Sequence, residues 1–257
     1  MTAGGSRLPS KASEARLRRL AARLGYRLER VDKPREPAAQ LVATLRHFGV
    51  DAVLDVGANT GQYARALRGA GYDGPILSFE PLPEVHAVLE AGARGDPSWR
   101  VAPPMALGAA DGEVAIARSA ESDMSSILPQ NRLLRAISPS SAVRERITVT
   151  LRRLDSIPEI DPAWRRLFLK IDVQGYEPQV LAGVGSLWPR ILGVQLEMAL
   201  VPLYEGEREF RATIAAMEAR GYDLHLLIPG YFERKLGRQL QVDGVFYRRD
   251  AAEERDG

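Results

Sequence analysis

The sequence contains no cysteine, and its 257 residues include only three histidines. The absence of cysteine excludes disulfides, thiolate nucleophiles and cysteine-ligated zinc or iron–sulfur sites. No stretch approaches the roughly 18 to 20 consecutive apolar residues that a membrane-spanning helix needs, and the first residues lack the apolar run of a signal peptide. We therefore expect a soluble protein of the cytoplasm. With 45% apolar and 26% charged residues, the chain can bury one sizeable core.

Positive charge is concentrated at the N-terminus. Residues 1–35 hold ten basic and three acidic residues, a net charge of +7, whereas the remaining chain holds 25 basic and 30 acidic residues, a net charge of −5. Because an acidic body is not suited to binding phosphates, we expect no nucleic-acid partner. In the basic arm, Leu17, Leu20 and Leu24 recur at helical spacing, which indicates an amphipathic helix. Such a helix either makes peripheral contact with an anionic membrane or a partner, or packs on the main domain.

From residue 52 onward, short β-rich runs alternate with helical patterns, which predicts an α/β fold with a doubly wound sheet. The expected strands are 52–56, 76–79, 167–171, 191–196, 224–228 and 245–247, and the expected helices lie near 60–69, 83–92, 176–183 and 207–219. We assign 36–250 to one domain, with the serine-rich segment 119–141 as a loop or lid over the site. Residues 1–35 form the helical arm, and we expect 251–257 to be a disordered tail.

The most informative segment follows the first expected strand, where a glycine-containing turn leads into a helix. Gly57 and Gly61 stand four apart with Asn59 between them, which differs from the three-glycine pattern that wraps a dinucleotide pyrophosphate. Glu80 follows the next strand, 25 residues beyond Asp55, where a carboxylate can accept hydrogen bonds from both ribose hydroxyls. The turn and the carboxylate together favour a site for an adenosyl ligand other than NAD. As alternatives, Asp55 fixes the turn and Glu80 is a solvated carboxylate at a strand end.

Six short motifs follow one another along the chain. They are VLDVGANTGQ at 53–62, FEP at 79–81, ALG at 106–108, SSIL at 125–128, LKIDVQGYE at 169–177 and PLYEG at 202–206. In this order they resemble the motifs of FkbM-type S-adenosylmethionine-dependent methyltransferases over about residues 40–248. The block at 169–177 is the most specific part of the resemblance, and the basic arm lies outside it.

This resemblance implies a class I methyltransferase fold, a Rossmann-like sheet of seven strands with the last one antiparallel, and S-adenosyl-L-methionine as the cofactor. It implies that the motif at 53–62 holds the methionine end of the cofactor, that Glu80 holds the ribose, and that Ala106 and Leu107 lie beside the adenine. The cofactor-binding candidates are Asp55, Gly57, Ala58, Asn59, Gly61, Gln62, Glu80, Pro81, Ala106, Leu107 and Ser126.

Two further carboxylates are the catalytic candidates. Methyl transfer to an alcohol needs a base for the hydroxyl proton, or a metal ion that stabilises the forming alkoxide. Asp172 and Glu197 each end an expected strand, at the edge where ligand sites of open α/β sheets form. We expect one of them to be the base, or both to hold a divalent cation. The alternatives are that Asp172 caps the helix near Tyr176 and that Glu197 pairs with an arginine of the lid.

We therefore expect an S-adenosylmethionine-dependent O-methyltransferase that acts on a hydroxyl of a sugar, a glycolipid or a polyketide-type small molecule, as the resemblance implies. Tyr176, Tyr204 and Tyr231 are candidates for the acceptor pocket. Two other classes stay open: a nicotinamide-dependent oxidoreductase, which shares the sheet and the ribose carboxylate, and a non-catalytic module that binds the cofactor and is tethered by residues 1–35. The acceptor and the oligomeric state do not follow from the sequence.

Overall fold

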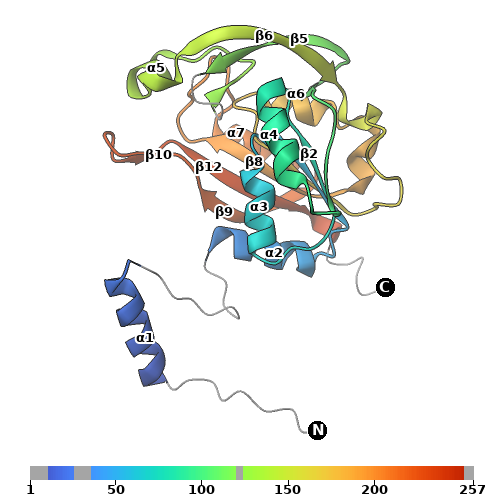
Figure 1. Ribbon diagram of the computed structural model, residues 1–257. Coiled ribbons are helices and arrows are strands. Elements are labelled where there is room, and N and C mark those ends of the chain that lie inside the picture. The colour runs from blue at the N-terminus through green and yellow to red at the C-terminus, as the bar shows by residue number, and fades with distance from the viewer. Residues whose placement is uncertain (1–10, 26–35, 120–123, 252–257) are drawn as a thin grey trace.

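The computed structural model describes residues 11–25, 36–119 and 124–251 (Figure 1). A seven-stranded sheet forms its centre. Across the sheet the strands are β3 (Trp99–Val101), β2 (Ile76–Phe79), β1 (Ala52–Val56), β7 (Leu167–Ile171), β8 (Ile191–Ala199), β12 (Gln241–Arg248) and β9 (Tyr222–Pro229). The first five are parallel, and β12 runs antiparallel to both of its neighbours. The expected seven-stranded α/β sheet with an antiparallel last strand is confirmed.

Helices cover both faces of this sheet, so that two apolar layers enclose it (Figure 1). One face carries α2 (Pro37–His47), α3 (Gln62–Gly69) and α4 (Pro83–Ala93), and the other carries α6 (Glu177–Ala182) and α7 (Phe210–Ala219). Successive residues of a strand face opposite layers, so Val53 and Phe168 pack on the first face and Leu54 and Leu169 on the second. Both β1 and β7 are buried along their whole length, and their sequences are apolar except for Asp55 and Lys170.

A second, three-stranded sheet interrupts the alternation of strands and helices. It consists of β4 (Ala106–Leu107), β6 (Val143–Arg152) and β5 (Gly112–Ser119), in that order. The segment 119–141, which the sequence predicts as a loop or lid, contains the helix α5 (Arg132–Ile137). Asn131 caps this helix at its N-terminus, because its side chain accepts a hydrogen bond from the Leu134 amide at 3.0 Å. Residues 120–123 of that segment lie outside the described residues.

Two smaller differences concern short elements. The strand β3 was not expected, because three residues are too few for a periodic pattern. The expected disordered tail is wrong at its first residue: Ala251 is fully buried and ends the short 3-10 helix Arg249–Ala251. Residues 252–257 lie outside the described residues. A two-stranded hairpin of β10 (Phe232–Glu233) and β11 (Arg238–Gln239) precedes β12.

The helix α1 (Lys11–Arg23) lies apart from the sheet and its covering helices (Figure 1). Leu17, Leu20 and Leu24 are 52%, 59% and 68% exposed, so packing of this apolar stripe on the main domain is not supported. Peripheral contact of the arm with a membrane or a partner stays a prediction. Within the described parts of the chain, none of the helices combines the length and the apolar character needed to cross a bilayer.

Replacing Gly183 with alanine is expected to lower the free energy of unfolding by about 1 to 3 kcal/mol. A Cβ atom at Gly183, just after α6, would overlap the carbonyl oxygen of Gly108, just after β4. The matched control is Gly69→Ala in α3, where no atom lies within 4 Å of the new Cβ. Thermal unfolding should show a lower Tm for Gly183→Ala and an unchanged or higher Tm for the control. Equal Tm values for both variants would contradict the close approach of α6 to the small sheet.

Candidate active site

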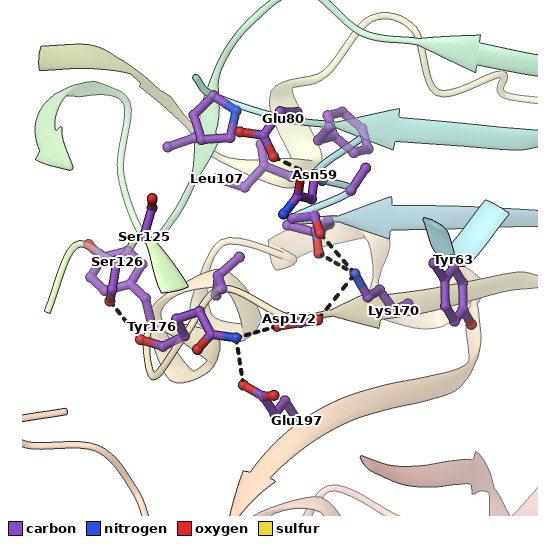
Figure 2. Close-up of a pocket in the computed structure, with 18 of the residues that line it drawn as sticks. Asn59, Tyr63, Glu80, Leu107, Ser125, Ser126, Lys170, Asp172, Tyr176 and Glu197 are labelled. Atoms are coloured by element: carbon purple, nitrogen blue, oxygen red, sulfur yellow. Dashed lines mark hydrogen bonds and ion pairs between the residues drawn. The ribbon is translucent and has the colours of Figure 1, made fainter. Parts of the chain in front are cut away.

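A cavity of about 540 Å³ opens where the parallel strands of the main sheet end, beside the small sheet (Figure 2). This volume lies within the range of small-molecule sites, roughly 300 to 1,000 Å³. Most of the predicted site residues line it. They are Gly57, Ala58, Asn59, Gln62, Glu80, Pro81, Ala106, Leu107, Ser126, Asp172 and Glu197. Asp55 and Gly61 are the two candidates that do not line the cavity.

Glu80 is a buried carboxylate held by two backbone amides at one end of the cavity. One oxygen accepts a hydrogen bond from the Asn59 amide at 3.0 Å (Figure 2). The other accepts one from the Leu82 amide, also at 3.0 Å. Glu80 is 6% exposed, and burial raises its pKa although both amide contacts oppose the shift. Each oxygen keeps a lone pair that can accept a hydroxyl hydrogen. The solvated carboxylate considered for this position is therefore not what the structure shows.

The turn after β1 brings two strand ends into contact. Gly57 has a φ of +74°, and a Cβ atom there would overlap the backbone carbonyl of Asp172 at the end of β7. Glycine is therefore required here because the ends of β1 and β7 lie so close together. The same glycine also lets a ligand come close to the backbone. Asn59 also has a positive φ, of +48°, and its side chain accepts a hydrogen bond from the Thr60 amide at 2.7 Å. This contact fixes the turn that faces Glu80.

Asp55 and Gly61 support the site from behind its surface. Asp55 is fully buried, and its Oδ1 lies 3.1 Å from Nζ of Lys170. Gly61 precedes α3, and a Cβ atom there would lie 2.7 Å from the Trp99 ring. Direct contact of these two residues with a cofactor has no support in this geometry. The burial of Asp55 and its ion pair with Lys170 agree better with the alternative role, in which Asp55 fixes the local structure.

Lys170 is a buried cation that joins the ends of β1 and β7. Its Nζ donates a hydrogen bond to the carbonyl oxygen of Gly57 at 2.9 Å and lies 3.8 Å from Oδ2 of Asp172 (Figure 2). Burial alone would lower the pKa of Lys170, but the carboxylates of Asp55 and Asp172 outweigh that effect and raise it. The side chain therefore stays protonated, and it neutralises negative charge at this point of the cavity.

Gln174 connects the two catalytic candidates. Its Nε2 donates hydrogen bonds to Oδ1 of Asp172 at 2.9 Å and to Oε2 of Glu197 at 3.0 Å. The hydroxyl of Tyr204 donates to Oε1 of Gln174 at 2.9 Å, which fixes the orientation of the amide. Gln174 has a φ of +56°, a conformation that is uncommon for a residue with a side chain. The structure thus brings Asp172 and Glu197 together through a residue that the sequence analysis did not single out.

The carboxylates at this end of the cavity are harder to ionise than usual. Burial, and then the charge of Asp172, raise the pKa of Glu197 well above its usual range. Burial raises the pKa of Asp243, on the neighbouring strand, to about 6. The alternative roles do not match the contacts: α6 begins after Tyr176 without a side-chain cap, and the described partner of Glu197 is Gln174 rather than an arginine.

The possibility that Asp172 and Glu197 share a divalent cation does not fit the donor geometry. The two carboxylates both accept from Nε2 of Gln174, so a donor nitrogen stands where a bridging cation would be. Among the described residues, no group of three or more histidine or acidic side chains is placed to hold a metal ion.

Four polar cavity residues on α3, β8 and β12 were not predicted: Tyr63, Gln195, Gln241 and Asp243. The signal for three of them was present in the sequence, because Gln195, Gln241 and Asp243 interrupt apolar strands at alternating positions. Their approach to the cavity depends on the pairing of β12 with β8, which the sequence does not give. Of the three tyrosines considered for the acceptor pocket, Tyr176 and Tyr231 line the cavity and Tyr204 does not.

The sheet and the cavity define the class of protein. A sheet of order β3-β2-β1-β7-β8-β12-β9 with β12 antiparallel, and a ligand cavity at its parallel strand ends, is the class I methyltransferase fold. The cavity suits S-adenosylmethionine, because Glu80 offers acceptors for ribose hydroxyls and Met105, Leu107 and Ile116 supply apolar walls for a flat base. The family model described as "Methyltransferase FkbM domain" matches residues 55–224. The chain belongs to this family of S-adenosylmethionine-dependent methyltransferases, which sets aside the nicotinamide-dependent oxidoreductase.

Several solved structures are similar to this chain at low sequence identity. A TehB-like SAM-dependent methyltransferase from Corynebacterium glutamicum has 12% identity and a TM-score of 0.43 over 93% of this chain and 97% of that chain. Magnesium protoporphyrin IX methyltransferase from Synechocystis PCC 6803 has 9% identity and a TM-score of 0.46 over 95% and 86%. An O-methyltransferase from Bacillus cereus has 11% identity and a TM-score of 0.45 over 94% and 93%. No curated protein matches the chain.

Replacing Glu80 with glutamine is expected to weaken binding of S-adenosylhomocysteine roughly 10- to 100-fold, the usual worth of hydrogen bonds to a charged group. The change removes the negative charge and places the amide NH2 group, a donor, against one of the two backbone N–H donors. Glu84→Gln on α4 is the control, because that carboxylate is 43% exposed and pairs with Arg118 at the surface. Calorimetry on both variants, with circular dichroism to verify folding, measures the difference. Equal affinity of Glu80→Gln and the wild type would rule out Glu80 as the ribose site.

Proposed function

We propose that the protein transfers a methyl group from S-adenosylmethionine to a hydroxyl oxygen of a small-molecule acceptor. When bound, the cofactor supplies an electrophilic methyl group on a sulfonium sulfur. The observation that carries the proposal is the position of Glu197, a half-buried carboxylate with a raised pKa in the same cavity as Glu80. Glu80 follows β2 and Glu197 belongs to β8, three strands further along the sheet. The two ends of the cavity therefore suit a cofactor and an acceptor side by side.

The assignment of the proton to Glu197 follows from the charges around it. As the oxygen–methyl bond forms and the carbon–sulfur bond breaks, the hydroxyl proton must leave, because an alcohol ionises far above pH 7. The ammonium of Lys170 lies 3.8 Å from the carboxylate of Asp172 and compensates the negative charge of that carboxylate. Glu197 has Gln174 as its described partner, and burial, followed by the charge of Asp172, raises its pKa. A carboxylate with a raised pKa is the stronger proton acceptor of the two.

The acceptor class rests on the residues that line the rest of the cavity. Tyr176 and Tyr231 supply aromatic faces, which pack well against sugar rings and other partly apolar surfaces. A sugar, a glycolipid or a polyketide-type molecule with a free hydroxyl is the proposed acceptor. A module that only binds the cofactor needs no pair of carboxylates held in place by Gln174, so these groups favour catalysis.

Replacing Glu197 with glutamine is expected to lower kcat about 100-fold or more, the usual contribution of a general base. The affinity for S-adenosylhomocysteine should stay within about twofold of the wild type, because Glu197 lies away from the ribose end. Transfer of tritiated methyl groups into a protein-free methanol extract of cells that produce the protein measures the rate. Glu205→Gln, an exposed glutamate in the loop after β8, is the control.

The pH dependence tests the same assignment. Only the ionised carboxylate accepts a proton, so kcat of the wild type should rise with pH through the raised pKa of Glu197 and level off above it. The groups whose charges act on Glu197 are Asp172, Glu177, Asp243 and Glu207. The acidic limb of the profile should be missing in Glu197→Gln. A variant that keeps the wild-type rate, or the same acidic limb, would remove Glu197 from the mechanism.

A further inference from the structure

Next to the proposed base Glu197, the neighbouring strands β8 and β12 carry three further polar side chains on the same face of the sheet. Gln195 and Glu197 alternate along β8, and Gln241 and Asp243 alternate along β12, so each pair faces one side of the sheet. Asp243 stands directly opposite Glu197 in the antiparallel register. Side chains paired in this way lie about 5 Å apart at Cβ. All four residues line the cavity.

Asp243 presents one oxygen to the cavity while the other is held. Its Oδ2 accepts a hydrogen bond from Nε2 of Gln195 at 2.9 Å. The orientation of that amide is fixed in turn, because the hydroxyl of Tyr63 donates to Oε1 of Gln195 at 2.9 Å. Oδ1 of Asp243 accepts no hydrogen bond from any described residue. A carboxylate oxygen that is fixed in place and open to the cavity is suited to accept a hydrogen bond from a ligand.

Gln241 offers the complementary group. Its side chain is 4% exposed, and its Nε2 finds no hydrogen-bond acceptor among the described residues. Buried amide donors are nearly always paired, because an unpaired one loses its contacts with water without compensation. Gln241 and Asp243 are two residues apart on one strand and therefore face the same way. A hydroxyl group satisfies both, since it accepts a hydrogen from Gln241 and donates one to Asp243.

The charges of the cavity determine which acceptors fit. Its carboxylates are Glu80, Asp172, Glu197 and Asp243. Among the described lining residues, Lys170 is the one lysine or arginine, and its ammonium already pairs with Asp55 and donates to the Gly57 carbonyl. A phosphate or carboxylate on the acceptor would therefore lie near negative charge without a cation to bind it. Uncharged hydroxyl groups avoid this repulsion.

We propose that Gln241 and Asp243 form a subsite for a second hydroxyl group, and that the acceptor is an uncharged molecule with hydroxyls on two adjacent carbons. One hydroxyl is methylated at Glu197, and its neighbour is bound by Gln241 and Asp243. The close pairing of Glu197 with Asp243 matches the short separation of hydroxyls on adjacent carbons. This inference rests on the proposed methyl transfer and adds the class of acceptor to it.

A fractionated extract tests the acceptor class. A methanol extract of cells that produce the protein is separated on an anion-exchange resin into a neutral fraction and a retained anionic fraction. Each fraction is incubated with the full chain and methyl-tritiated S-adenosylmethionine, with and without prior treatment by periodate that is then quenched. Periodate cleaves the bond between adjacent carbons that both carry hydroxyls. We expect most of the label in the neutral fraction, and its loss after periodate.

The outcomes separate the subsite from the methyl transfer. Most of the label in the anionic fraction, or labelling of the neutral fraction that survives periodate, would overturn the subsite and leave the methyl transfer standing. The absence of label from every fraction would overturn the methyl transfer itself, and the subsite with it. Calorimetry with S-adenosylhomocysteine on the same protein shows in each case whether the cofactor site is intact.

Substitutions at the subsite test the two residues. In Asp243→Asn the amide of Gln195 still finds an oxygen acceptor, but an NH2 donor replaces the oxygen that faces the cavity. In Gln241→Leu the side-chain NH2 donor of residue 241 is lost. We expect at least a tenfold lower kcat/KM for the neutral fraction, measured over a dilution series, with affinity for S-adenosylhomocysteine within twofold. Asp223→Asn on β9, whose carboxylate is 51% exposed and pairs with Arg249, is the control and should match the wild type. Wild-type kcat/KM in both subsite variants would overturn the assignment.

Discussion

The buried ammonium of Lys170 is the constraint on which the site depends. It lies 3.1 Å from a carboxylate oxygen of Asp55 and donates to the carbonyl of Gly57, so it ties the end of β7 to the end of β1. Asp55 is itself held by Ser78 of β2 through a hydrogen bond of 3.3 Å. Removing one partner of such a pair leaves an uncompensated buried charge, which costs about 3 to 5 kcal/mol. The turn that faces the cofactor end and the carboxylate of Asp172 are therefore positioned by one cation.

The side-chain amides of Gln174 and Gln195 hold the carboxylates at the acceptor end of the cavity in place. A tyrosine hydroxyl orients each one: Tyr204 donates to Gln174, and Tyr63 donates to Gln195. Each amide then has its nitrogen directed at carboxylates, with Gln174 serving the two catalytic candidates and Gln195 serving Asp243. Groups that are oriented before a ligand arrives need no reorganisation during the reaction. The acidic groups are therefore held close together and stay available to an acceptor.

The apolar runs predicted the main strands of the sheet, the family resemblance implied its antiparallel last strand, and the motifs at strand ends supplied many of the polar residues that line the cavity. The sequence did not predict contacts made between distant segments. Asp55 was expected at the cofactor, but Lys170, 115 residues further along, covers its carboxylate. Gln174 was missed because its role depends on a positive φ, and Asp243 because its place depends on the register of β12 against β8. The helix in 119–141 was missed because it spans only six residues.

A crystal structure of the full chain with S-adenosylhomocysteine tests the central claim most directly, namely that one cavity holds the cofactor at Glu80 and the reacting groups at Glu197. The account predicts that both ribose hydroxyls bind the carboxylate of Glu80 and that the sulfur faces Asp172 and Glu197. It also predicts that the space beside Asp243 stays open for an acceptor. A ribose bound away from Glu80, or a sulfur that faces away from Glu197, would contradict it.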